Sequence, residues 1–169
     1  MSSLLKPQGL LKGRLRVLTD ALPEGLRLRS RSVVERGPER IDLLRTPDLF
    51  QPLACLYAGT EQAVGFIGLD TLAHKESDRL RDLAESLAAL GVKVDRSDEG
   101  FWITPTRLGR ATAHAFATHG DHRLAMALAP LALITGRIIL RDPDVVTTSY
   151  PTSWTDLRAA AIRVEFSAG

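Results

Sequence analysis

The segment from His74 to Gly91 constrains the fold of this chain more than any other stretch. Its apolar residues recur at three- and four-residue steps, which places them on one face of a helix: Leu80, Leu83, Ala84, Leu87 and Leu90. Ser77 or Asp78 can cap the start of this helix. Gly91 stands where a left-handed residue commonly ends one. The pattern therefore predicts an amphipathic helix that buries one face.

The start of this helix is densely charged. Six polar residues follow one another: His74, Lys75, Glu76, Ser77, Asp78 and Arg79. Free N–H groups and the helix dipole make a helix N-terminus suited to receive an anion. By itself, such a charge pattern is more often a solvated first turn. Other motifs are needed to choose between the two interpretations.

Composition places the chain among ordinary soluble proteins of one domain. It has 169 residues, of which 44% are hydrophobic and 25% charged. The net charge of +2 gives little support to nucleic-acid binding, and the arginines of the N-terminal third belong to no recognised nucleic-acid motif. No apolar run has the length of a membrane span, and no secretory signal opens the sequence. We expect a cytoplasmic protein that binds neither nucleic acid nor membrane.

Cysteine and histidine argue against a metal or thiol site. Cys55 is the single cysteine and lies in an apolar stretch, so we expect a buried structural thiol in a reducing compartment. The four histidines are not at ligand spacing on one helix face: His74, His114, His119 and His122. We therefore expect no metal.

The remaining pattern predicts a mixed α/β fold. Strands are expected over residues 26–34, 41–44, 63–67, 92–94, 101–104, 115–117 and 137–140. Helices are expected over residues 47–58, 80–90, 121–134 and 153–164. Pro52 predicts that the first helix is distorted or starts late, and Gly59 is expected to end it. No Gly-rich phosphate loop is present, so neither a Rossmann nor a P-loop fold is supported.

Two further helix starts are polar. Thr46-Pro47-Asp48 offers a threonine cap, a proline at the first helical position and an acid. Gly120-Asp121-His122-Arg123 runs into an apolar helix body, and Ser149-Tyr150-Pro151 precedes the last helical stretch. If these starts are neighbours, they bring together two arginines, which suit a carboxylate or phosphate, and acids able to move protons. Such a pocket suits a small polyanionic substrate.

The order of the motifs TPDLF, KESDRL, GDHRLAMA and SYP resembles the C-terminal half of the 5-enolpyruvylshikimate-3-phosphate (EPSP) synthase family, over about Ile41 to Leu157. The resemblance implies an α/β fold of repeated βαβαββ units with the helices packed inside, as in the two-domain enolpyruvyl transferases. Residues 41–169 would form the C-terminal domain, and residues 1–40, which carry no motif, would belong to it. The partner N-terminal domain would lie outside this chain.

Members of this family are transferases of the shikimate pathway, which leads to the aromatic amino acids. They move the enolpyruvyl group of phosphoenolpyruvate to the 5-hydroxyl of shikimate-3-phosphate, without a metal or organic cofactor. By resemblance, Asp48 matches the aspartate that contacts the shikimate hydroxyls and is cast as the base. Glu76 matches the acid that protonates the methylene carbon. Each could instead serve only to cap or complement a helix.

The resemblance also assigns residues that bind the substrates. Lys75 matches a lysine of the shikimate-phosphate site. Arg79 and Arg123 match the pair that clamps the phosphoenolpyruvate carboxylate, and His122 matches the histidine beside it, although a structural histidine is an equal alternative. Asp121 is interpreted as a capping residue that orients an arginine.

Two departures leave other functions open. Thr148 stands where the family usually has a lysine that contacts phosphoenolpyruvate, and Thr152-Ser153-Trp154 replaces an acid followed by aromatic residues. Because half of the two-domain enzyme has no match, we expect the isolated chain to be inactive, as an excised or truncated fragment. The alternatives are a non-catalytic anion-binding or assembly domain on the same scaffold, and a relative of the UDP-N-acetylglucosamine enolpyruvyl transferases, whose cysteine-bearing loop has no counterpart here.

Overall fold

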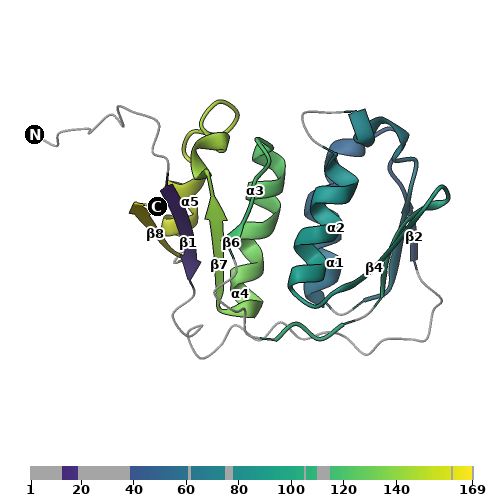
Figure 1. Cartoon of the computed structure of the whole chain (residues 1–169), viewed down its shortest axis with the longest axis horizontal. Coiled ribbons are helices and arrows are strands. Elements are labelled where there is room, and N and C mark those ends of the chain that lie inside the picture. Colours follow the sequence, from purple (N-terminus) through teal and green to yellow (C-terminus); the bar gives the residue numbers. More distant parts are fainter. Residues whose placement is uncertain are drawn as a thin grey trace, which may run out of the picture.

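Two four-stranded β-sheets form the outer layers of the molecule, and helices fill the space between them (Figure 1). The structure is a computed structural model that describes residues 13–18, 39–60, 62–74, 78–104, 106–109, 115–160 and 162–168. The first sheet contains, in spatial order, β6 (Ala115–Phe116), β7 (Arg137–Arg141), β1 (Gly13–Leu18) and β8 (Arg163–Ala168). The second contains β2 (Glu39–Asp42), β3 (Val64–Ile67), β5 (Gly100–Thr104) and β4 (Lys93–Ser97).

The helices form two layers between these sheets. The α-helices are α1 (Phe50–Thr60), α2 (Arg79–Ala89), α3 (His122–Leu128), α4 (Ala132–Thr135) and α5 (Ser153–Ala159). Short 3-10 helices join them: η1 (Pro47–Leu49), η2 (Asp70–His74), η3 (Ala129–Leu131) and η4 (Pro143–Val146). In Figure 1, α1 and α2 line the second sheet, and α3 with α4 lines the first. The expected α/β fold with helices inside and sheets outside is confirmed.

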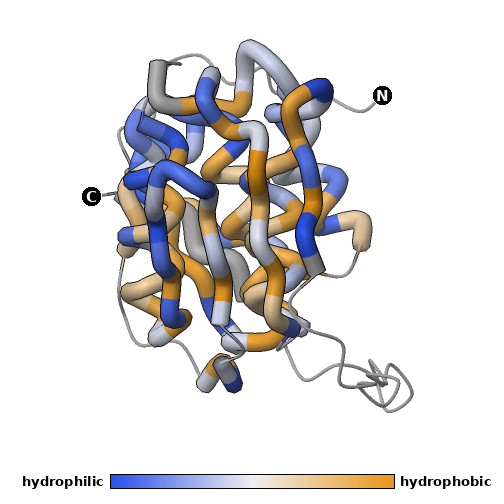
Figure 2. The backbone as a smooth tube through the Cα atoms, turned by 90° about the vertical axis from the view of Figure 1, so that its right-hand side faces the viewer, coloured by the Kyte–Doolittle hydropathy of each residue, from blue (hydrophilic) through white to orange (hydrophobic). Residues whose placement is uncertain are grey.

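The second sheet shows how alternation along a strand buries one face. β3 pairs in parallel with β2 and antiparallel with β5, which forms a hairpin with β4. Val64, Phe66, Phe101 and Ile103 are buried. Figure 2, which looks onto this sheet, shows hydrophobic and hydrophilic residues alternating along the strands, as a sheet with one buried face requires.

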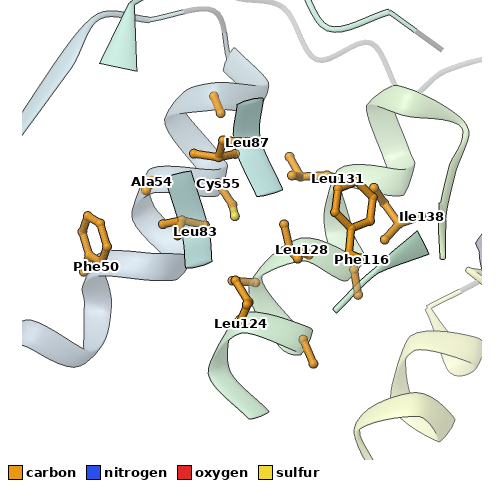
Figure 3. Close-up of a cluster of buried hydrophobic side chains, with 14 of the residues drawn as sticks. Phe50, Ala54, Cys55, Leu83, Leu87, Phe116, Leu124, Leu128, Leu131 and Ile138 are labelled. Carbon is orange, nitrogen blue, oxygen red and sulfur yellow. The ribbon is translucent and has the colours of Figure 1, made fainter. Parts of the chain in front are cut away.

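The two helical layers share one hydrophobic core. In Figure 3, Ala54, Cys55 and Leu87 on one side face Leu128 and Leu131 on the other. Phe50 packs edge-on against Phe66 and Phe101, with ring centroids 5.6 and 4.9 Å apart. Because Cys55, Leu87, Leu128 and Leu131 lie between helices from both layers, the layers cannot move apart without exposing the core.

The first helix begins late, as Pro52 predicted. Residues 47–49 form η1, and α1 starts at Phe50, so that Pro52 lies in the first turn, where a missing N–H costs no helical bond. Two details of the prediction are wrong. Thr46 occupies the cap position of η1, but its side chain makes no capping hydrogen bond. Gly59 lies inside α1, which continues to Thr60.

The second helix agrees with its prediction. Asp78 is its cap and accepts a hydrogen bond of 3.0 Å from the Arg81 backbone N–H. Leu83 and Leu87 on the predicted apolar face are fully buried. Gly91 has a φ of +85°, the left-handed conformation expected after a helix.

The helix predicted over residues 121–134 is interrupted. It consists of α3, η3 and α4, because Pro130 lacks the N–H that a continuous α-helix needs. Gly136 ends α4 with a φ of +80°, as expected. The strand predicted over 41–44 lies two residues earlier, since Asp42 turns the chain by accepting a hydrogen bond from the Leu44 backbone N–H.

The helix predicted over residues 153–164 is also wrong in its second half. α5 ends at Ala159, and β8 follows it. Ile162 and Val164 are buried while Arg163 and Glu165 are exposed, and this period of two is that of a strand. The strand predicted over residues 26–34 lies outside the described residues. In the part of the chain that the structure describes, no helix is long and apolar enough to cross a membrane.

Candidate anion-binding site

Three helices begin at the same end of the molecule. α1 with the preceding η1, α2 and α3 all start at the upper end in Figure 1, and the loop after η4 lies at that end too. α1 contacts both α2 and α3, and η4 contacts α3. The predicted polar helix starts are therefore neighbours in space, although they are far apart in the sequence.

A buried aspartate links these helix starts. Asp121 is completely buried, and one of its oxygens, Oδ1, caps α3 by accepting a hydrogen bond of 2.9 Å from the Arg123 backbone N–H. The other, Oδ2, accepts from Arg79 Nε at 3.0 Å and from Gln51 Nε2 at 3.1 Å. The interpretation of Asp121 as a cap that orients an arginine is confirmed. Its three donors compensate for the burial of the carboxylate.

A second carboxylate bridges the two predicted clamp arginines. Asp48 Oδ1 accepts from Arg79 Nη1 at 3.2 Å, and Asp48 Oδ2 lies 3.0 Å from Arg123 Nη2. The Asp48 side chain is 50% exposed and that of Arg123 33%, whereas Arg79 is 1% exposed. One carboxylate thus spans two guanidinium groups at a position that solvent reaches, which is the geometry a bound carboxylate or phosphate would adopt.

The charges of this cluster balance within the protein. Arg79 and Arg123 contribute two positive charges, and Asp48 and Asp121 two negative ones. Arg79 is held on both sides by carboxylates, as a buried guanidinium requires. Arg123 Nε is buried and has no hydrogen-bond partner among the described residues. Among these four described residues there is therefore no net charge, and Asp48 is the carboxylate most open to exchange with an incoming anion.

The structure brings together half of the predicted site residues. Asp48, Arg79 and Arg123 are in direct contact, as described above. Lys75 and Glu76 lie outside the described residues. His122 is the first residue of α3 and is partly buried, next in sequence to Arg123.

Sequence reasoning missed Gln51. It lies in the first turn of α1, is 2% exposed and donates to Asp121. The available signal was an uncharged polar residue within the otherwise apolar stretch from Phe50 to Leu56. Nothing in the sequence connects it to a partner 70 residues away.

The loop after η4 carries hydroxyl groups, and it contains Thr148 at the position where the family usually has a lysine. Thr148 is exposed. Tyr150 Oη and Thr152 Oγ1 both donate to Asp156 Oδ2, at 2.7 and 2.8 Å. These two hydrogen bonds hold the pKa of Asp156 below its usual value, and the bond from Tyr150 makes the larger contribution. The same bond to Asp156 raises the pKa of Tyr150.

The second departure has a structural role. Trp154 is 7% exposed and its Nε1 donates to the Pro143 carbonyl oxygen at 3.0 Å. This bond ties α5 to η4 and therefore fixes both ends of the hydroxyl-bearing loop between them.

Cys55 is a buried structural thiol, as predicted. It is 3% exposed, and burial raises its pKa to about 12. A thiol that stays protonated at neutral pH is a poor nucleophile. Among the described side chains, no group of three or more His, Cys, Asp or Glu residues is arranged to hold a metal ion.

Comparisons with known proteins assign the family. The family model described as EPSP synthase (3-phosphoshikimate 1-carboxyvinyltransferase) matches residues 24–157. A 3-phosphoshikimate 1-carboxyvinyltransferase of Bacteroides fragilis is 35% identical over 90% of this chain and 37% of its own length. One of Methanosphaerula palustris is 37% identical over 72% of this chain and 28% of its own.

A solved structure supports the same assignment. The EPSP synthase of Acinetobacter baumannii matches with a TM-score of 0.65 and 28% identity, over 72% of this chain and 28% of that one. The chain thus spans between 28 and 37% of the length of these relatives. Taken with the helix starts and their arginine pair, these matches show that the chain belongs to the EPSP synthase family.

Proposed function

We propose that this chain forms one side of the active-site cleft of an enzyme that transfers the enolpyruvyl group of phosphoenolpyruvate to the 5-hydroxyl of shikimate-3-phosphate. The observation that carries the proposal is the arginine pair. Arg79 and Arg123 come from different helices, and one carboxylate already spans them, with distances of 3.2 and 3.0 Å to Asp48. By analogy with the family, the carboxylate they would bind is that of phosphoenolpyruvate.

The clamp would work by exchange of carboxylates. A substrate carboxylate that contacts both guanidinium groups must displace Asp48 from at least one of them. Asp48 is half exposed and can turn away, while Asp121 keeps Arg79 in place. The displaced Asp48 would then be free to accept the proton of a shikimate hydroxyl, as a general base requires.

The remaining roles follow the family pattern. Glu76 would protonate the methylene carbon of phosphoenolpyruvate, and Lys75 would bind the phosphate of shikimate-3-phosphate. In the sequence, Glu76 stands three residues and Lys75 four residues before Arg79. His122 would contact the substrate beside Arg123. None of these steps needs a metal or organic cofactor.

Binding of the anion can be tested on the full chain by NMR titration with phosphoenolpyruvate and, separately, with inorganic phosphate. We expect weak binding with shifts concentrated at the starts of α2 and α3, lost in Arg123→Gln. The matched control is Arg81→Gln, since Arg81 lies on the first turn of α2 but pairs with Asp82 and Glu85. Equal losses in both variants would show non-specific attraction, and shifts that map elsewhere would contradict the clamp.

Catalysis would need a second domain on the opposite side of the cleft. Closure of two domains excludes water and brings two anionic substrates together. We therefore expect no phosphate release from both substrates with the chain alone, and release when a separately produced N-terminal domain of a family member is added. Thr148→Lys should raise the activity by lowering the apparent KM for phosphoenolpyruvate, since a charged hydrogen bond is worth about 1.5–3 kcal/mol. Turnover by the isolated chain would contradict the proposed location of the site.

A second candidate function is a non-catalytic domain that binds anions or assembles with a partner. The exposed Thr148 favours it, because it supplies no charge where the family has a lysine. If the reconstituted pair stays inactive with either Thr148 or Lys at this position while anion binding persists, the binding function should replace the catalytic one.

A further inference from the structure

A buried hydrogen bond from α1 reaches the carboxylate that holds the clamp. Gln51 is 2% exposed and its Nε2 lies 3.1 Å from Asp121 Oδ2. The same oxygen lies 3.0 Å from Arg79 Nε. A single oxygen atom therefore receives a neutral donor from α1 and a charged donor from α2.

We propose that Gln51 is a positioning residue that fixes the orientation of the Arg79 guanidinium through Asp121. With Asp121 Oδ1 engaged by the Arg123 backbone N–H at 2.9 Å, the carboxylate is held at both oxygens. Its plane then determines the direction from which Arg79 Nε can donate. The guanidinium is planar, so fixing Nε also fixes Nη1, which is the atom that contacts Asp48.

The arrangement exceeds what folding alone requires. Asp121 would retain an ionic partner in Arg79 and a backbone donor without Gln51. A polar side chain buried on the core side of α1 is costly unless its hydrogen bond is made. The bond to Asp121 compensates for this cost. It also gives the Asp121 carboxylate a third donor, besides Arg79 and the Arg123 backbone N–H, and so restrains its orientation further. A binding site gains affinity when its donors are restrained before the ligand arrives.

The test compares two variants of the full chain that each lose a buried hydrogen bond. Gln51→Met removes the amide donor at nearly constant volume and keeps a good helix former. Thr135→Val is the matched control, because Thr135 is 2% exposed and its Oγ1 bonds the Leu131 and Arg137 carbonyls, away from the arginine pair. Gln51→Leu serves as a second substitution if the methionine variant does not fold.

The readout is the rate at which the Arg79 Nε–H exchanges with water, followed by NMR and assigned by its loss in Arg79→Lys. We expect this exchange to be roughly fivefold faster in Gln51→Met than in Thr135→Val when the two are compared at equal stability. If Gln51 contributes only to folding, the two variants will exchange at the same rate, and the inference is overturned.

A second measurement connects the position of Arg79 to binding, and this part rests on the proposed anion clamp. The dissociation constant for inorganic phosphate should rise roughly three- to tenfold in Gln51→Met and stay unchanged in Thr135→Val. Faster exchange with unchanged phosphate affinity would overturn the positioning role in binding. If the parent chain binds no phosphate, the proposed clamp fails, while the exchange rates still decide whether Gln51 fixes Arg79.

Discussion

Asp121 and Asp78 are two helix caps that differ in burial and in their side-chain partners, and these differences predict unequal effects on stability. Each accepts a hydrogen bond from a backbone N–H of its helix, at 2.9 Å in α3 and 3.0 Å in α2. Asp121 is in addition completely buried and pairs with Arg79, which is 1% exposed. Replacing each aspartate with alanine therefore removes a cap in both variants, and in Asp121→Ala alone it also removes a buried ionic partner and the acceptor of the Gln51 amide.

The expected magnitudes follow from these contacts. Loss of a cap costs about 1 kcal/mol in the free energy of unfolding, and this is the whole effect expected for Asp78→Ala. Removal of one partner of a buried ion pair costs a further 3–5 kcal/mol or so, because the remaining charge stays buried. Asp121→Ala should therefore cost about 4–6 kcal/mol in total. Asp121→Asn, which keeps an oxygen acceptor, should fall between the two alanine variants.

Urea unfolding of the full chain, followed by far-UV circular dichroism and tryptophan fluorescence, measures this difference. Coincident transitions are required before the free energies are compared. In thermal melts the difference of several kcal/mol corresponds to roughly 2–4 °C for each kcal/mol. If Asp121→Ala costs no more than Asp78→Ala, Arg79 does not depend on Asp121, and the electrostatic account of the site is wrong.

Three further predictions concern other groups. Asp48→Asn should tighten phosphate binding about three- to tenfold in NMR titrations, because it removes a competing charge from a half-exposed position, whereas weaker binding would show that Asp48 assists the ligand. Burial raises the pKa of Cys55 to about 12 in the folded chain, so this thiol should resist a thiol reagent at pH 8. The free energy of unfolding should fall as the pH rises past about 9, because there the thiol ionises only in the unfolded chain. Tyr150→Phe should raise the pKa of Asp156 in an NMR titration, and an unchanged pKa would contradict the hydrogen bond. The stability that this bond contributes should be present above the pKa of the unfolded carboxyl group and lost as the pH falls through the lower pKa of the folded state.

Local patterns in the sequence predicted the parts of the fold that local physics controls. The period of apolar residues and the cap signals placed α2 between Asp78 and Gly91 to within a residue. The proline rule gave the late start of α1 at Phe50. The proposed clamp pair, Arg79 and Arg123, could be named because each stands at a recognisable helix start. Their meeting in space depended on the fold, which the motif order supplied by resemblance.

Errors arose where two rules competed or where a contact spans a long sequence distance. The apolar run after Asp121 outweighed Pro130 in the prediction, but the missing N–H breaks the helix. The last helix was extended through Ile162 and Val164, whose alternation is that of β8. Gln51 could not be identified, since its role depends on Asp121, and no periodicity relates residues on different helices.

The departures from the family pattern fall on one side of the site. Arg79, Asp121 and Gln51 form a buried cluster, and a change at Arg79 or Asp121 would leave a buried charge without its ionic partner. Thr148 is exposed in a loop that Trp154 fixes at a distance, and a change there costs the fold little. Stability alone is therefore a sufficient reason for the buried arginine network, whether or not it takes part in the proposed catalysis. We expect the residue at this exposed position to affect catalysis without disturbing the fold, so Thr148→Lys in a reconstituted pair tests the proposed function while leaving the buried cluster intact.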